Sequence, residues 1–193
     1  MRFVLASHNK KKLAEMSDIL SGLGIEITAL PEGAPEPEEN GKTFAENALI
    51  KARATFEYTG LPAIADDSGL AVDALNGAPG VYSARYCEGT DKDRNAFLLK
   101  NMENVPDGER TGRFICSISC VLSAEREISA EGACEGIILR EERGEGGFGY
   151  DPLFFVEQFG CTFGELSAEQ KHTVSHRGRA LRVLEEKLRA ENL

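Results

Sequence analysis

Two adjacent aspartates are the first candidates for chemistry in this chain, because neighbouring carboxylates can share a metal ion. Asp66 and Asp67 end an apolar run and are followed by Ser68 and Gly69. Adjacent residues of a strand point to opposite faces, so the two carboxylates converge only if the chain bends here. Magnesium commonly binds one or two carboxylates together with substrate phosphates and water. The motif indicates either such a magnesium site or a turn in which an aspartate bonds its own backbone.

Two basic segments could bind the phosphates that would accompany a magnesium ion. The first runs from Ser7 to Lys12 (SHNKKK), and the second begins at Ser175 and includes His176 and Arg177. Both stand where a helical pattern begins, and the N–H groups at a helix N-terminus favour anions. Each segment taken alone is also typical of a capped helix with charged residues in solvent. The first segment lacks the glycines of GxxxxGK[ST], so it is not a P-loop.

A glycine-rich segment, residues 146–152 (GGFGYDP), could bind a flat heterocycle. Glycines let the backbone approach a ligand closely, and either Phe148 or Tyr150 could stack on a base. Asp151 could accept hydrogen bonds from the N–H groups of that base. A hairpin turn with core aromatic residues is the alternative explanation.

The acidic loop at residues 31–42 is a further source of carboxylates. It contains Glu38 and Glu39 in a Pro- and Gly-rich stretch, which is also typical of a solvated surface loop. Asn47 and Lys51 follow one turn apart on the less apolar side of a predicted helix. These two side chains face either a cleft or the solvent.

The elements that must position these residues alternate between strand and helix. Apolar residues at three- and four-residue steps, as at Leu13, Met16, Leu20 and Leu23, predict helices, and strict alternation predicts strands. We expect the third strand to be interrupted by a polar turn at Asp66. The pattern is that of a single α/β domain, residues 1–193, with a mixed sheet. The predicted strands are residues 3–6, 25–29, 63–72, 113–122 and 128–138, and a further strand follows the glycine-rich segment. The predicted helices begin near Lys10, Thr43, Thr90 and Ser175.

Composition narrows the class of protein. The 193 residues are 41% hydrophobic and 28% charged, with a net charge of -10. That balance is typical of a globular protein and unlike the basic surface of nucleic-acid-binding proteins. No stretch approaches the roughly 18 apolar residues of a membrane span, and no signal peptide is evident. We therefore expect a cytoplasmic protein that binds neither nucleic acid nor membrane, with its five cysteines as free thiols.

Six segments, taken in order, resemble the inosine triphosphate pyrophosphatase family, the non-canonical purine NTP pyrophosphatases. They extend from residue 7 to residue 181 and cover nearly the whole chain. Any one of them is a weak signal, but six in series at compatible spacings are specific. The segments are SHNKKK, TFAENALIKA, ADDSGLAV, GAPGVYSARY, GGFGYDPLF and SHRGRAL.

This resemblance implies an elongated mixed β-sheet flanked by helices, with two lobes around a central nucleotide-binding cleft. It implies a Mg²⁺-dependent homodimer that converts ITP, dITP or XTP and water to the monophosphate and pyrophosphate. Such an enzyme would cleanse the nucleotide pool.

The resemblance also assigns roles to particular positions. Asp67 resembles the catalytic acid–base residue and a magnesium ligand, and Glu38 resembles the second ligand, with Glu39 as the alternative. Ser7 stands where the family often has threonine, and His8 and Lys11 replace smaller residues. The expected substrate contacts are Ser7, His8, Asn9, Lys10, Lys11, Lys12, Ser68, Phe148, Gly149, Tyr150, Asp151, Lys171, His176 and Arg177.

Overall fold

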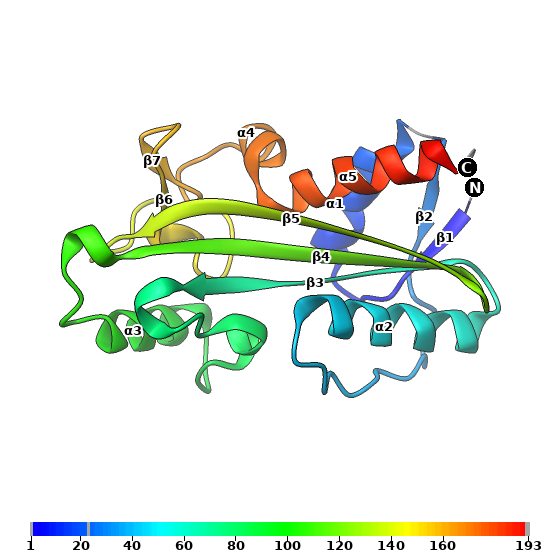
Figure 1. Ribbon diagram of the computed structural model, residues 1–193, viewed down its shortest axis with the longest axis horizontal. Helices are drawn as coiled ribbons and strands as arrows, with labels where there is room; N and C mark the ends of the chain where they lie inside the picture. The colour runs from blue at the N-terminus through cyan, green and yellow to red at the C-terminus, as the bar shows by residue number, and fades with distance from the viewer. Residues whose placement is uncertain (1, 23, 192–193) are drawn as a thin grey trace. The chain divides into compact units, whose positions relative to one another are not determined.

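The computed structural model describes residues 2–22 and 24–191 (Figure 1). Leu23, the last apolar residue of the first predicted helix, lies outside the described residues. Within them, seven strands form one sheet in the order β2-β1-β3-β4-β5-β6-β7. β1 pairs in parallel with β2 and β3, whereas β6 pairs antiparallel with β5 and β7, so the expected mixed sheet is confirmed. The strands are β1 (Arg2–Leu5), β2 (Glu26–Thr28), β3 (Ala63–Val72), β4 (Thr111–Ser123), β5 (Arg126–Ile138), β6 (Phe154–Val156) and β7 (Cys161–Thr162).

The helices begin where side chains cap them. Thr43 and Thr90 each start a helix through a capping box, with Glu46 and Asp93 as the reciprocal partners. None of the helices in the described ranges is long and apolar enough to cross a membrane. The helices are α1 (Lys10–Ser21), α2 (Phe44–Thr59), α3 (Asp91–Asn101), α4 (Ala168–Val174) and α5 (His176–Ala190).

The third strand corrects one prediction from the sequence. β3 runs from Ala63 to Val72 without a break, so the polar turn expected at Asp66 is absent from this described segment. Ile64 packs with α1 and α5, whereas its neighbour Ala65 packs with α2. Asp66 and Asp67 continue this alternation, so their carboxylates point to opposite faces instead of converging. Backbone pairing in the sheet keeps the strand regular where the polar sequence suggested a turn.

Contacts divide the chain into two compact units. The first comprises Met1–Asp67, Cys116–Gly132 and Arg179–Leu193. In this unit α1 and α5 cover one face of the strands and α2 covers the other (Figure 1). Cys116 and Cys120 are fully buried on the face shared with α1 and α5, where they pack as small apolar side chains.

The second unit comprises Ser68–Ile115 and Ala133–Gly178. Its core contains the edge-to-face ring pair of Phe114 and Phe154, packed with Leu98 of α3. Arg110 is buried there, and its guanidinium donates hydrogen bonds to the backbone oxygens of Met102 and Ile138, each at 2.8 Å. This cation joins the end of α3 to β5 by donating hydrogen bonds to a backbone carbonyl oxygen of each.

Candidate functional site

The Asp67 carboxylate is held by two side chains of α2. Lys51 Nζ lies 3.1 Å from Oδ1, and Asn47 Nδ2 donates to Oδ2 at 3.2 Å. Asn47 and Lys51 are one turn apart, so the capped start of α2 presents both to the strand. Burial raises the pKa of the Asp67 carboxyl, and the Lys51 ammonium opposes that rise. Asp67 is therefore a partly buried carboxylate with a proton affinity above the ordinary one.

Lys51 lies between two carboxylates. Its Nζ is also 3.0 Å from Glu39 Oε1 in the acidic loop. Burial by itself would lower the pKa of Lys51, but Asp67 and Glu39 together raise it. Glu38, the neighbour in the loop, is exposed. Of the two acids considered for the metal, Glu39 is thus the one joined to Asp67 through Lys51, and Glu38 faces solvent.

The basic segment Ser7–Lys12 spans the start of α1 and contains both capping and exposed residues. Asn9 Oδ1 accepts a hydrogen bond from the Lys12 backbone N–H at 3.3 Å, and Ser7 Oγ accepts one from the Asn9 N–H at 3.1 Å. These contacts organise the first turn of α1. His8 and Lys10 are exposed, whereas the side chain of Lys11 lies outside the part of the chain that the structure describes.

Lys12 pairs with the other aspartate of β3. Its Nζ is 3.0 Å from Asp66 Oδ1, and the Asp66 side chain is only 1% exposed. Asp66 therefore neutralises a lysine of α1, whereas Asp67 meets α2 on the opposite face of β3. The two adjacent aspartates therefore have different partners and different roles.

In the second unit, Asp151 organises the glycine-rich loop. Its carboxylate accepts hydrogen bonds from Lys171 Nζ at 2.5 Å and from the Phe148 backbone N–H at 2.8 Å. Asp151 is 2% exposed, and burial raises the pKa of its carboxyl while Lys171 opposes the rise. A Cβ on Gly147, whose φ is 77°, would lie 2.2 Å from the Asp151 carboxylate. Glycine is needed at this position because its φ is positive and because a side chain would collide with Asp151.

The two aromatic residues of this loop have different environments. Phe148 is 46% exposed, with Lys171 Nζ 4.8 Å from its ring centroid. Tyr150 is 4% exposed, and its hydroxyl donates to the backbone oxygen of Ser83 at 2.8 Å. Tyr150 is therefore part of the core, and Phe148 is the ring available to stack on a ligand.

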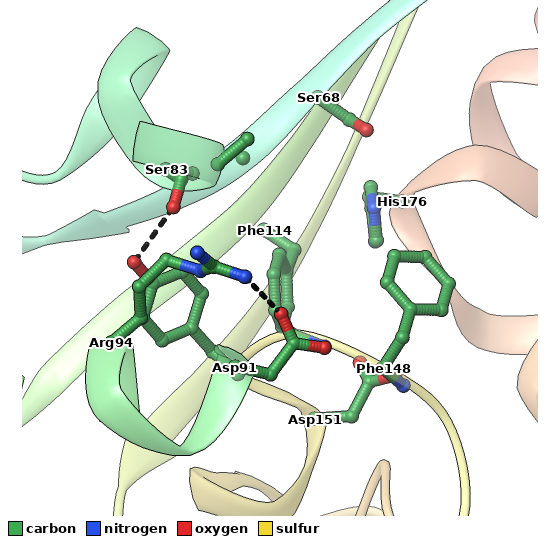
Figure 2. A pocket seen from close by; sticks show the side chains of 12 residues that line it. Ser68, Ser83, Asp91, Arg94, Phe114, Phe148, Asp151 and His176 are labelled. Carbon is green, nitrogen blue, oxygen red and sulfur yellow. Dashed lines mark hydrogen bonds and ion pairs between the residues drawn. The ribbon is translucent and has the colours of Figure 1, made fainter. Parts of the chain in front are cut away.

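A cavity of about 150 Å³ lies beside this loop (Figure 2). One wall is the buried ring of His176, stacked on Phe114 with 4.8 Å between ring centroids. Figure 2 shows the Phe148 ring beside His176, with Asp151 below it. Of the predicted contacts, the cavity is lined by Ser68, Phe148, Gly149, Tyr150, Asp151 and His176.

The remaining predicted residues of this unit lie around the cavity lining. Arg177 is 2% exposed, and its Nη2 is 3.5 Å from Ser68 Oγ, while Lys171 contacts Asp151 and Phe148. Asp91 and Arg94 of α3 also line the cavity, and neither was predicted from the sequence. Their only sequence signal was the cap of α3, which indicates a helix start and no ligand.

Comparisons with known proteins identify the family of this chain. The model of the Ham1 family matches residues 3–187. The dITP/XTP pyrophosphatase of Desulforamulus reducens is 52% identical over 187 residues, which cover 94% of this chain and 92% of that protein. A HAM1 protein structure from Coxiella burnetii is 44% identical with a TM-score of 0.92, covering 98% of this chain and 99% of that one.

A second solved structure adds a named activity. The crystal structure of a nucleoside-triphosphatase, a dITP/XTP pyrophosphatase, from Mycobacterium abscessus is 46% identical, with a TM-score of 0.78. It covers 95% of this chain and 98% of that chain. The family match and the full-length identities confirm the resemblance found in the six segments. The chain belongs to the Ham1 family.

Proposed function

We propose that this protein hydrolyses non-canonical purine nucleoside triphosphates, namely ITP, dITP and XTP, to the monophosphate and pyrophosphate. Relatives named dITP/XTP pyrophosphatase match it over nearly their whole length. The observation that carries the proposal is the partly buried Asp67 carboxylate, held by Asn47 and Lys51. Removing such triphosphates would cleanse the nucleotide pool.

Mg²⁺ is the proposed cofactor, with Asp67 and Glu38 as its ligands. The Lys51 ammonium already lies between the carboxylates of Asp67 and Glu39, so this region of the first unit accommodates a cation. Glu38 is the second ligand that the family resemblance implies, and Glu39, which shares Lys51 with Asp67, is the alternative. Among residues 2–22 and 24–191, no group of three His, Cys, Asp or Glu side chains forms a metal cluster. One or two carboxylates completed by substrate phosphates suit magnesium, which neutralises phosphate charge when bound.

Asp67 is the proposed general base. It takes a proton from the water whose oxygen attacks the α-phosphorus, and the bond from that phosphorus to the bridging oxygen breaks to release pyrophosphate. Burial raises the pKa of the Asp67 carboxyl, which makes it a stronger base than an exposed aspartate. Lys51 holds the carboxylate in place, and Lys12 and the N–H groups that begin α1 bind phosphate oxygens.

The base-binding residues belong to the second unit. Phe148 would stack on the purine, and donors of His176, Arg177 and the loop Phe148–Asp151 would bind the 6-oxo group of hypoxanthine or xanthine. Adenine carries an amine at that position, which cannot accept hydrogen bonds from these donors. A site built on such hydrogen bonds rejects the wrong base strongly.

Phe148→Ala is expected to raise KM for dITP about tenfold, because stacking of a base on an aromatic ring contributes roughly 1–3 kcal/mol. Tyr150→Phe is the matched control. It removes only the hydroxyl bonded to Ser83, so we expect a loss of about 1 kcal/mol in unfolding free energy and an almost unchanged KM. Steady-state kinetics and thermal unfolding of both variants check this. A larger KM change in Tyr150→Phe than in Phe148→Ala would mean that Tyr150, and not Phe148, contacts the base.

The proposed reaction is tested by a product-resolved assay with Mg²⁺ and the substrates ITP, XTP, dITP, GTP and ATP. Monophosphate and pyrophosphate, formed fastest from the first three, are the expected result. Orthophosphate release would instead indicate a general nucleoside triphosphatase. Nucleotide binding without turnover would indicate a sensor.

We also propose that the protein is a homodimer, as the family resemblance implies, and that it acts in the cytoplasm. Light scattering coupled to size-exclusion chromatography would give a mass near twice the 21.0 kDa of one chain. A mass of one chain at micromolar concentration would contradict the dimer.

A further inference from the structure

Gly149 lies at the centre of the loop that carries the proposed base contacts. Its φ of 61° is in the left-handed region, as is that of Gly147 at 77°. Glycines lose the most backbone entropy on folding, so a loop with three of them, Gly146, Gly147 and Gly149, needs contacts from outside to hold one conformation. Within the loop, the Asp151 carboxylate accepts a hydrogen bond from the Phe148 N–H, one residue before Gly149.

Helix α3 supplies contacts to both polar groups of Gly149. Asp91 Oδ2 accepts a hydrogen bond from the Gly149 N–H at 2.8 Å. Asn95 Nδ2 donates to the Gly149 carbonyl oxygen at 3.2 Å. Because residues four apart share one face of a helix, a single face of α3 fixes the peptide groups on both sides of Gly149.

The two side chains of α3 are themselves fixed. Arg94 Nη2 lies 2.6 Å from Asp91 Oδ1, which leaves Oδ2 for Gly149, and Figure 2 shows this pair at the cavity. Asn95 is 2% exposed, and its Nδ2 also donates to Glu142 Oε1 at 2.6 Å. Asn95 is buried, and the Asp91 side chain, although 48% exposed, is held by two partners, Arg94 and the Gly149 N–H. Side chains with defined partners transmit position with little freedom, which is what support of a binding loop requires.

We propose that Asp91 and Asn95 are positioning residues for base recognition, acting through Gly149 on the neighbouring ring of Phe148 and on Asp151. The inference rests on the proposed function, because it takes the loop to bind the purine. Misplacement of a binding group by an ångström costs up to about a hundredfold in rate or affinity. Loss of the Asp91 contact should therefore impair binding and discrimination of the base more than the chemical step.

The test compares three variants of the full-length protein by steady-state kinetics with dITP and dGTP. For Asp91→Ala we expect KM for dITP to rise about tenfold, kcat to change less than about threefold, and the preference for dITP over dGTP to fall. Asp91→Asn keeps an oxygen acceptor for the Gly149 N–H and should restore KM to within about threefold. Asp93→Ala removes the carboxylate that caps the same helix turn through Thr90, so it should lower Tm and leave KM and selectivity unchanged.

A second readout needs no substrate. Hydrogen exchange of the Gly149 amide, followed by NMR in the free protein, should quicken about tenfold or more in Asp91→Ala and stay near the wild-type rate in Asp93→Ala. An unchanged KM in Asp91→Ala, or an equal rise in Asp93→Ala, would overturn the positioning role. Failure of the wild-type protein to hydrolyse dITP would contradict the proposed function. Unchanged Gly149 exchange in Asp91→Ala would then overturn the contact itself, so the two failures are distinguishable.

Discussion

Asp67→Asn is expected to lower kcat for dITP about 1,000-fold while the fold persists. The amide cannot take a proton from the attacking water, and general-base catalysis typically contributes about 10²–10⁴-fold. Lys51 keeps its ion pair with Glu39, so this buried cation retains a partner. Steady-state turnover with product analysis measures the loss, and circular dichroism with thermal unfolding checks the fold. Near-normal turnover in this variant would contradict the assignment of Asp67 as the general base.

Asp66→Asn is the matched control for that experiment, since it makes the same chemical change one residue away. Asp66 is bonded to Lys12 on the opposite face of β3. We expect this variant to lose stability because a buried ion pair is broken, but to retain far more turnover than Asp67→Asn. Equal losses of kcat in the two variants would mean that removal of a buried charge lowers kcat, rather than removal of a specific role of Asp67.

Lys171→Met is expected to lower the unfolding free energy by about 3–5 kcal/mol, because it leaves the Asp151 carboxylate buried without its ammonium partner. The Asp151 side chain is 3% exposed, and Lys171 Nζ is 2.5 Å from it. For a chain of this size the change corresponds to a drop of about 10 °C in Tm. Thermal unfolding without nucleotide measures it, and KM for dITP should rise in parallel.

The double variant Lys171→Met with Asp151→Asn separates charge from packing. Replacing the carboxylate by its neutral isostere removes the unpaired charge, so we expect about half or more of the lost stability to return. KM should stay high, because both groups are proposed substrate contacts. A Tm for Lys171→Met within about 2 °C of the wild type would show that the pair contributes little to the fold.

Local patterns in the sequence were sufficient to predict the features that depend on residues close in the chain. The capping box of Thr43 and Glu46 began α2 where expected, and alternating apolar residues correctly predicted the long strands β4 and β5. Both signals arise from contacts within a few residues, so local spacing is sufficient to read them. Six local segments in series also indicated the family, because each is a short run of neighbouring residues.

Packing in three dimensions fixes which neighbours in the chain act together. Asp66 and Asp67 point to opposite faces because sheet pairing keeps β3 extended, and Phe148 rather than Tyr150 is available for stacking because the core takes up Tyr150. The contact from Asp91 to Gly149 spans 58 positions in the chain. No local pattern indicates such a pair, because only the packing of α3 beside the loop brings the two residues together.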